Sequence, residues 1–189
     1  MKVREKGGED LRLTRRKVSN KNPDLQKIKS LFESSFDGSD FPSFRKLKMR
    51  SKKENVSFEA YYVDGSFFGL ACIIFNEDAV YIQCLAISGR YRSKGMGSLV
   101  VSDIKNRAAG RPVFAEIEKT AEGTDGYKEL KTLEFFAKNG FCDTGFSVKR
   151  KHKKYSVISD ASGFTTEKLF EICNGYSMDF YSPEIIFNR

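Results

Sequence analysis

The chain has 189 residues, and its 33 Lys and Arg against 25 Asp and Glu give a formal net charge of +8 at pH 7. This length allows one compact domain, and 17 Phe and 8 Tyr supply a core without any Trp. The positive charge favours an anionic partner, such as a nucleotide-bearing cofactor, a nucleic acid or an acidic surface.

The cysteines and the single histidine do not indicate a metal site. Cys72, Cys84, Cys142 and Cys173 lie far apart without Cys-x-x-Cys spacing, and His152 lies in a basic run. We therefore predict no metal. Cys72 and Cys84 fall within apolar strand patterns, so we expect them to be small core residues.

No segment of the sequence indicates export or membrane insertion. Met1 to Asp10 is polar and charged, and no apolar run approaches the ~20 residues that cross a bilayer. We therefore expect a cytoplasmic protein whose cysteines are reduced.

The N-terminal half begins with an edge-strand pattern at Leu11 to Ser19. Asn22 and Pro23 then predict a helix start, with Asn22 as N-cap and Pro23 at the first helical position. The helix is expected to end near Asp37-Gly38 and to bury one face, because five apolar residues recur at helical spacing. They are Leu25, Ile28, Leu31, Phe32 and Phe36.

Three antiparallel strands are predicted next. Val56 to Val63 and Phe67 to Phe75 flank Asp64-Gly65, a strong hairpin signal. Asn76-Glu77-Asp78 makes a second turn, which leads into a buried strand at Ala79 to Ile87.

The most informative junction is where this last strand runs into Ser88-Gly-Arg-Tyr-Arg-Ser-Lys-Gly-Met-Gly97 and opens a helix. A glycine-rich turn at a helix start leaves backbone N–H groups unpaired, and the helix dipole there favours a bound phosphate. Arg90, Arg92 and Lys94 add positive charge at the same place. The junction therefore predicts a phosphate site.

The second half continues with a helix from Gly97 to Ala109 and a strand at Pro112 to Glu118, which together imply a parallel crossover. Val100, Ile104 and Ala108 form the apolar side of that helix. Four further elements are predicted. They are a helix at Tyr127 to Asn139, strands at Cys142 to Val148 and Lys154 to Ser159, and a short helix at Thr165 to Cys173.

The basic run Lys149 to Lys154 interrupts the last two strands. We interpret it as the solvated tip of a hairpin. The alternative, a nucleic-acid contact, lacks neighbouring solvent-facing aromatics and an accompanying reading motif.

The segment Arg92-Ser-Lys-Gly95-Met-Gly97 resembles the Arg/Gln-x-x-Gly-x-Gly/Ala signature of the GNAT N-acetyltransferase superfamily. Leu133 to Phe141 resembles the family's Phe-Tyr-x-x-x-Gly-Phe element, and the strands and helix around the signature follow the family's order. The resemblance covers roughly residues 11 to 160. A dinucleotide fingerprint fits less well, because Val100 replaces its third glycine.

This resemblance implies an α/β (α+β) fold. The expected central sheet is mixed and mostly antiparallel, with about six to seven strands, flanking helices and splayed central parallel strands. Residues 1–10 are expected to be a flexible arm, 11–160 the acyltransferase domain, and 161–189 a C-terminal helix and tail packed on the same domain.

The resemblance also implies an acyl-CoA-dependent N-acyltransferase, which most simply transfers acetyl from acetyl-CoA to a primary amine by direct attack. The acceptor would be a small molecule or a protein. Backbone groups of the strand end would pair with the pantetheine arm, and amides of the turn would hold the pyrophosphate. The cofactor-binding candidates are Leu85, Ala86, Ile87, Arg92, Ser93, Lys94, Gly95, Met96, Gly97, Ser98 and Phe136.

The catalytic candidates are Glu116 and Glu118, which share one face of their strand. One of them would act through a water or bind the substrate cation. The alternative is that both pair with nearby Arg or Lys.

Phe136 departs from the pattern, because many members have at this position a tyrosine that protonates the leaving thiolate, and phenylalanine cannot donate that proton. Tyr81 likewise falls where some members place a general-base glutamate. Tyr127, Tyr155 or water would then protonate the thiolate, or the chain is a non-catalytic, basic interaction or nucleic-acid-binding module.

Residues 39–55 are polar and basic, with Phe41 and Phe44 as apolar members. In the superfamily the corresponding region commonly covers the acceptor, which implies a mobile helical lid. A surface helix-loop anchored by the two phenylalanines is the alternative.

Overall fold

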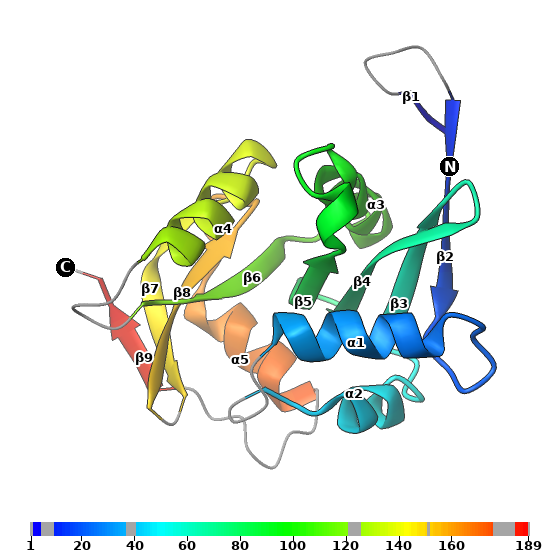
Figure 1. Ribbon diagram of the computed structural model, residues 1–189. Helices are drawn as coiled ribbons and strands as arrows, with labels where there is room; N and C mark the ends of the chain where they lie inside the picture. Colours follow the sequence, from blue (N-terminus) through cyan, green and yellow to red (C-terminus); the bar gives the residue numbers. More distant parts are fainter. Residues whose placement is uncertain are drawn as a thin grey trace. The chain divides into compact units, whose positions relative to one another are not determined.

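The computed structural model describes residues 2–4, 10–36, 41–120, 126–150, 152–175 and 184–188. The chain divides into two compact units. Unit 1 consists of Met1–Ile73 and Gln83–Ile104, and unit 2 of Ile74–Ile82 and Lys105–Arg189. Strands β4 and β5 and helix α3 contribute residues to both units (Figure 1).

Unit 1 contains a sheet whose strands run in the order β1-β2-β3-β4-β5. Its elements are β1 (Lys2–Arg4), β2 (Asp10–Lys17), α1 (Leu25–Ser35), α2 (Phe44–Arg50), β3 (Val56–Val63), β4 (Ser66–Phe75), β5 (Val80–Ile87), the 3-10 turn η1 (Gly89–Tyr91) and α3 (Met96–Ala108). The ranges predicted for β3, β4, β5 and α3 agree with these within one residue.

The N-terminal strand β1 was not predicted. Lys2–Arg4 pair antiparallel with Asp10–Arg12, so β2 has a neighbour there and is not the edge strand that the sequence suggested. Residues 5–9 of the predicted arm lie outside the described residues.

The hairpin between β3 and β4 confirms the Asp64-Gly65 prediction. Asp64 and Gly65 have φ of 46° and 79°, the pair of positive angles that a two-residue type I′ turn requires. The Asp64 carboxylate accepts a hydrogen bond from the Arg12 backbone N–H at 3.0 Å, which fixes the turn against β2.

The two faces of β3 receive different helices, because side chains alternate along a strand. On one face the Phe58 ring lies 6.1 Å from Phe32 of α1 and 5.5 Å from Phe44 of α2. On the other face the Tyr61 hydroxyl donates to Asp103 of α3 at 3.2 Å. Helices α1 and α2 therefore cover one face of β3, and α3 covers the other.

The predicted start of α1 is wrong by two residues. The helix begins at Leu25 after Asp24. The buried Asn22 side chain accepts hydrogen bonds from the Asp24 N–H at 3.0 Å and the Tyr62 hydroxyl at 2.9 Å. Asn22 therefore ties the loop to β3 instead of capping the helix.

The basic segment after α1 forms α2 and is anchored by its two phenylalanines. Phe41 stacks on Phe36 at 5.0 Å, and the buried Phe44 packs on Phe32 at 5.5 Å. Ser43 caps α2 by accepting from the Lys46 N–H at 3.3 Å. The anchored helix-loop is confirmed and the lid function stays a prediction; residues 39 and 40 lie outside the described range.

Unit 2 contains strands in the order β5-β6-β8-β7-β9. Its further elements are β6 (Val113–Glu118), α4 (Tyr127–Lys138), β7 (Cys142–Arg150), β8 (Lys153–Ser159), α5 (Thr166–Gly175) and β9 (Glu184–Phe187). Val80–Ile82 of β5 pair in parallel with Val113–Ala115 of β6. The pairs of β8 with β6 and of β7 with β8 and β9 are antiparallel.

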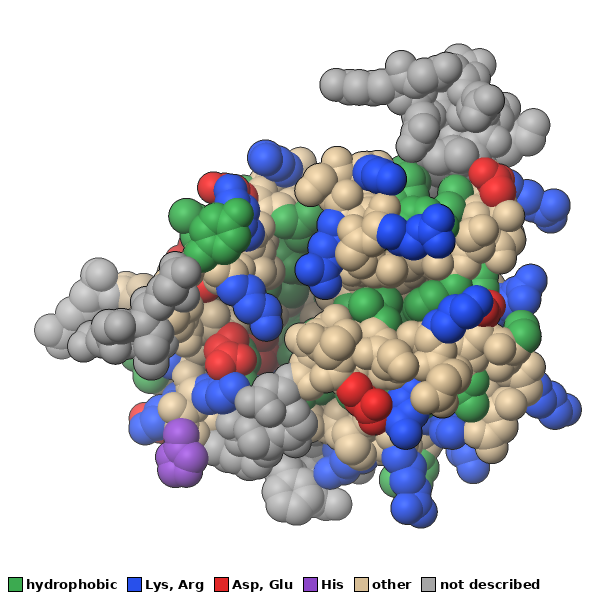
Figure 2. Space-filling view, in the orientation of Figure 1, with side chains coloured by type: hydrophobic (Ala, Val, Ile, Leu, Met, Phe, Trp, Pro, Cys, Tyr) green, Lys and Arg blue, Asp and Glu red, His purple; other side chains and the backbone are tan. Residues whose placement is uncertain are grey.

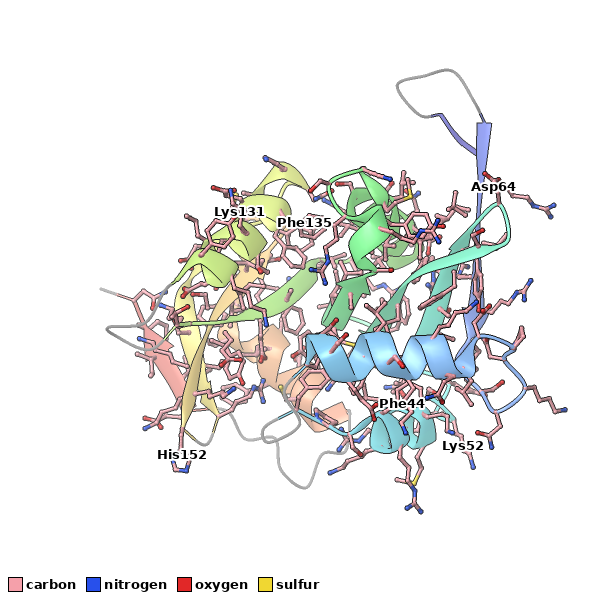
Figure 3. All side chains as sticks on the ribbon, in the orientation of Figure 1. Phe44, Lys52, Asp64, Lys131, Phe135 and His152 are labelled. Atoms are coloured by element: carbon pink, nitrogen blue, oxygen red, sulfur yellow. The ribbon has the colours of Figure 1, made fainter. Side chains whose placement is uncertain are left out.

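The predicted fold class is confirmed, with helices flanking a mixed, mostly antiparallel sheet. The sequence predicted about six to seven strands, and the described residues form a sheet of nine; the short strands β1 and β9 are the ones that it missed. The predicted β7–β8 hairpin is confirmed, but only part of the basic run is its tip, where Figure 3 shows His152. Lys149 and Arg150 lie in β7 and Lys153 and Lys154 in β8, and Lys151 lies outside the described residues. Among the described residues, no helix has the length and hydropathy to span a membrane.

Candidate cofactor site and carboxylates

Backbone groups at the C-terminal end of β5 point alternately to its two sides. The Ser88 N–H donates to the Phe68 carbonyl of β4 at 2.8 Å. Backbone groups of alternate residues point to the same side of an antiparallel strand, so those of Ala86 are directed toward β4. Those of Leu85 and Ile87 are directed to the opposite edge. Of the three predicted pantetheine-binding residues, Leu85 and Ile87 therefore have the suitable orientation.

Gly69 of β4 makes this end of β5 possible, and the sequence analysis missed it. A Cβ at Gly69 would lie 2.8 Å from Ile87 Cδ1 and 2.9 Å from the Ala86 carbonyl oxygen. The Ile87 side chain could move away, but the backbone carbonyl of Ala86 could not without a shift of the strand, so the close approach of β5 depends on glycine. An isolated glycine in a strand pattern was the available signal.

The turn between η1 and α3 presents a row of amides. Ser93 and Gly95 have left-handed φ of 59° and 77°. The Leu99 N–H donates to the Gly95 carbonyl at 3.1 Å. The amides of Met96, Gly97 and Ser98 precede this bond and have no intrahelical acceptor. The predicted helix start is therefore present in the backbone, and its binding of an anion stays a prediction.

The residues around this turn differ in their exposure. Arg92, Ser93 and Lys94 are exposed, whereas Met96 and Gly97 are buried beneath the turn. Arg92 Nε donates to the Ile87 carbonyl oxygen at 2.9 Å, so this guanidinium ties the turn to the end of β5. The site thus combines an amide row with positive charge, which fits a diphosphate.

Phe136, predicted to contact the cofactor, lies on α4 in unit 2. Its buried ring is 5.0 Å from the rings of both Phe135 and Phe141. This position supplies no proton donor. Of the two tyrosines considered instead, Tyr127 is exposed on α4, and Tyr155 lies on β8 opposite Glu118.

The two candidate catalytic carboxylates differ in their surroundings. Both oxygens of Glu116 are held by Arg150: Nε donates to Oε2 at 2.8 Å, and a terminal nitrogen donates to Oε1. Glu118 pairs with Lys153 at 2.8 Å, and its side chain is 52% exposed against 4% for Glu116. Both carboxylates therefore pair with a basic residue, which is the alternative that the sequence left open. The partners, Arg150 and Lys153, could not be named from the sequence.

The buried thiols are confirmed as core residues. Cys72 and Cys84 are both buried. A hydrogen bond with Cys84, together with burial, raises the pKa of Cys72 well above its usual value. Burial raises the pKa of Cys173 on α5 to about 12. The raised pKa values favour the protonated thiols of Cys72 and Cys173.

Comparison with known proteins identifies the class. Residues 25–141 match the acetyltransferase (GNAT) family. The chain therefore belongs to the GNAT family, whose acyl donor is acetyl-CoA, the predicted cofactor. Among curated proteins, no match to the sequence was found.

Several solved structures share the fold. An aminoglycoside 6'-N-acetyltransferase complexed with coenzyme A is 14% identical, with a TM-score of 0.59 over 77% of this chain and 95% of that one. Ard1 from Thermoplasma volcanium is 20% identical, with a TM-score of 0.58 over 77% and 95%. Arabidopsis thaliana Naa50, in complex with a bisubstrate analogue, is 16% identical, with a TM-score of 0.57 over 79% and 98%. At these identities the likeness establishes the fold alone.

Proposed function

We propose that this protein transfers an acetyl group from acetyl-CoA to a primary amine. The observation that carries the proposal is the amide row of the α3 start, set beside exposed Arg92 and Lys94 in a chain of this family. Amides without intrahelical acceptors, together with a helix dipole, bind phosphate groups without further machinery.

The residues of unit 1 have separate roles in this proposal. Amides of Lys94–Ser98 hold the diphosphate, and the backbone edge of Leu85 and Ile87 pairs with the extended arm as an added strand would. Bound acetyl-CoA supplies an activated acetyl group. One backbone N–H of this edge polarises the acetyl carbonyl, an effect typically worth about 3 kcal/mol. The chain need form no covalent intermediate.

The two carboxylates receive different roles. Glu116 has both oxygens engaged by Arg150, so we assign it to holding β6 and β7 together. Glu118 is half-exposed and has one cationic partner, so we assign it to binding the substrate cation. Loss of the amine's proton to water then precedes attack.

A cytoplasmic location forms part of the proposal. All four cysteines are free, and three of them are buried. Unpaired thiols are typical of reducing compartments.

A second candidate function is a non-catalytic basic module that binds nucleic acid or another polyanion. Phe136 and the charge of unit 1 favour it. Retention on an RNA or DNA column that falls steeply with salt, without any response to acetyl-CoA, would support this module and exclude the enzyme.

The test of the proposed function uses the full chain. We expect acetyl-CoA to raise the midpoint of thermal unfolding in a concentration-dependent way, because it binds the folded state. We also expect thiol release when a panel of primary amines is added. Absence of stabilisation at millimolar acetyl-CoA would overturn the proposal.

A further inference from the structure

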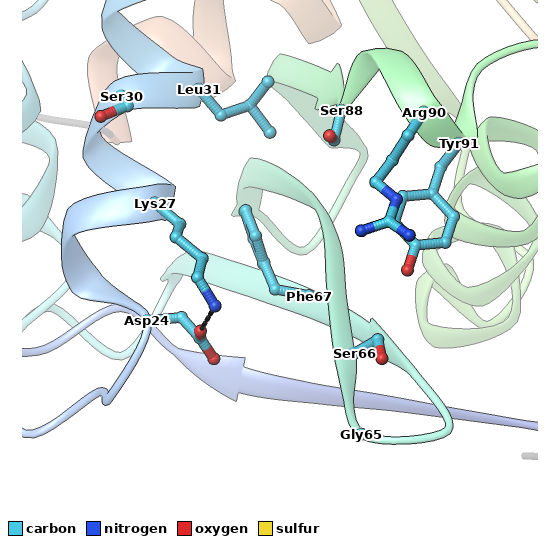
Figure 4. A pocket seen from close by; sticks show the side chains of 10 residues that line it. All are labelled: Asp24, Lys27, Ser30, Leu31, Gly65, Ser66, Phe67, Ser88, Arg90 and Tyr91. Atoms are coloured by element: carbon cyan, nitrogen blue, oxygen red, sulfur yellow. Dashed lines mark hydrogen bonds and ion pairs between the residues drawn. The ribbon is translucent and has the colours of Figure 1, made fainter.

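A pocket of about 600 Å³ lies entirely within unit 1 (Figure 4). Its walls come from helix α1, the β3–β4 turn and the η1 segment. The side chains used below are Asp24, Lys27, Leu31, Phe67, Arg90 and Tyr91. This volume is in the range of small-molecule sites, which run from about 300 to 1,000 Å³.

The charged groups leave the pocket with one cation in excess. Lys27 Nζ contacts Asp24 Oδ1 at 2.7 Å on the α1 wall, so these two charges offset each other (Figure 4). Arg90 lies on the opposite wall and stacks over the Tyr91 ring at 5.3 Å. No carboxylate in the described part of the chain pairs with Arg90. Its guanidinium is therefore available for a ligand anion.

The remaining lining mixes polar and apolar side chains, with Leu31 and Phe67 beside Ser30, Ser66 and Ser88. Leu31 projects from α1 and Phe67 from β4. The Phe67 ring lies 5.9 Å from Tyr62, whose hydroxyl donates to Asn22 at the entry to α1. The same Asn22 oxygen accepts from the Asp24 N–H. Tyr62 and Asn22 thus connect Phe67 with Asp24 across the pocket. Leu31 and Phe67 suit a ligand with an apolar part.

One pocket residue is the sequence neighbour of the β5 residues proposed to bind the cofactor. Ser88, one of the pocket's lining residues, directly follows Ile87 at the end of β5. Unit 1 also carries 19 Lys and Arg against 11 Asp and Glu. Such a field repels polycationic acceptors and attracts anionic ones.

We propose that the pocket binds the acceptor, and that this acceptor is an amino acid with an apolar side chain. Arg90 pairs with its carboxylate, Leu31 and Phe67 enclose its side chain, and its amine is left for the Ser88 end. The inference rests on the proposed function. In the transfer the amine nitrogen bonds to the acetyl carbon, the carbon–sulfur bond breaks, and nitrogen loses one proton while the thiolate gains one.

The first test measures binding without cofactor, by calorimetric titration of the whole chain. The probes are L-phenylalanine and 2-phenylethylamine, which share ring and amine but differ in the carboxylate. We expect phenylalanine to bind about tenfold more tightly, as a charge-assisted pair allows. Arg90→Gln should abolish that preference while leaving 2-phenylethylamine affinity unchanged.

A matched control removes the same charge elsewhere in unit 1. Arg45 is exposed on α2 and lines no part of the pocket. Arg45→Gln should change the affinity for either probe less than about twofold, because an exposed distant charge is screened by salt. Equal losses in Arg90→Gln and Arg45→Gln would overturn the pocket assignment and leave only a general charge effect.

A second variant fills the pocket without touching its charges. Ser30 lines it from an exposed position on α1, so Ser30→Trp is expected to fold and to weaken phenylalanine binding at least about tenfold. Equal or tighter binding of 2-phenylethylamine to the unmodified protein would contradict the proposal.

The cofactor response separates this inference from the proposed function. Stabilisation by acetyl-CoA without a preference for phenylalanine would overturn the acceptor assignment alone. Arg90-dependent phenylalanine binding without any acetyl-CoA response would overturn the proposed function and retain the pocket as a binding site.

Discussion

The two units of this protein use their charges differently. Unit 1 carries 19 Lys and Arg against 11 Asp and Glu, whereas unit 2 carries 14 against 14, so the whole net charge of +8 belongs to unit 1. In unit 2 the Glu116–Arg150 pair joins β6 to β7, and the Lys105–Asp160 pair joins α3 to the residue after β8. In unit 1 the exposed Arg90 and Lys94 pair with no described carboxylate.

This difference indicates which charges are structural and which are available to a ligand. Figure 2 shows further Lys and Arg side chains gathered around α2, in a segment that includes Arg45, Lys46, Lys48, Lys52 and Lys53. Unit 1 therefore has the field for anionic ligands, in addition to the Arg15–Asp103 pair that joins β2 to α3. Unit 2 has no net charge, and its ion pairs hold strands and helices together. The predictions below test this division.

The largest effect is expected from breaking the buried ion pair of unit 2. Glu116→Ala leaves Arg150, whose side chain is 16% exposed, without its carboxylate partner. Removing one partner of a buried ion pair costs about 3 to 5 kcal/mol of unfolding free energy, measurable by urea denaturation. The matched variant Glu118→Ala removes a half-exposed pair and should cost less than about 1 kcal/mol. Similar losses in both variants would contradict the structural role of Glu116.

A smaller effect is expected where β4 and β5 approach closely in unit 1. In Gly69→Ala the added Cβ would lie 2.9 Å from the Ala86 carbonyl, and overpacking of this kind costs about 1 to 3 kcal/mol. The shift of β5 should also weaken acetyl-CoA binding. Urea denaturation and calorimetry test both outcomes; unchanged values would show that β5 does not need this glycine.

The smallest effect is expected on the pH dependence of the unfolding free energy, through the thiol of Cys173. Its pKa of about 12 in the folded chain exceeds the unfolded value of about 8.5. The stability that this thiol contributes is therefore complete at a pH below the pKa of the unfolded chain. It is lost as the pH rises toward the pKa of the folded chain, by up to about 1.4 kcal/mol per pH unit. Urea denaturation at pH 8, 9 and 10 should give a shallower decline in Cys173→Ala. Cys142→Ala, at an exposed position, should keep the original slope.

The sequence predicted much of the fold because local signals there agree with tertiary contacts. The Asp64-Gly65 turn and the apolar face of Val100, Ile104 and Ala108 were predicted correctly, and those three side chains are buried. The start of α1 was predicted two residues too early, because Asn22 lies in the turn before the helix, where its oxygen also accepts from Tyr62, 40 residues away. Such a long-range partner leaves no local pattern.

The candidate site was predictable to the same extent. The helix start at the glycine-rich turn was located within one residue, and its role as a binding site stays a prediction. The partners of Glu116 and Glu118 come from β7 and β8, whose register with β6 no short sequence window contains. The pocket of unit 1 joins α1, the β3–β4 turn and η1, and therefore also required the structure.

The central claim is that the backbone of the α3 start binds the diphosphate of acetyl-CoA. Its most direct test is calorimetric titration of acetyl-CoA into Gly95→Ala and Gly163→Ala. Both glycines have φ near +78°, and an added Cβ would meet nothing within 4 Å, so the two variants carry the same backbone strain. We predict that Gly95→Ala lowers acetyl-CoA affinity at least about tenfold, because the turn that aims the amides is displaced. Gly163→Ala should bind like the unmodified protein; equal affinity in the two variants would contradict the claim.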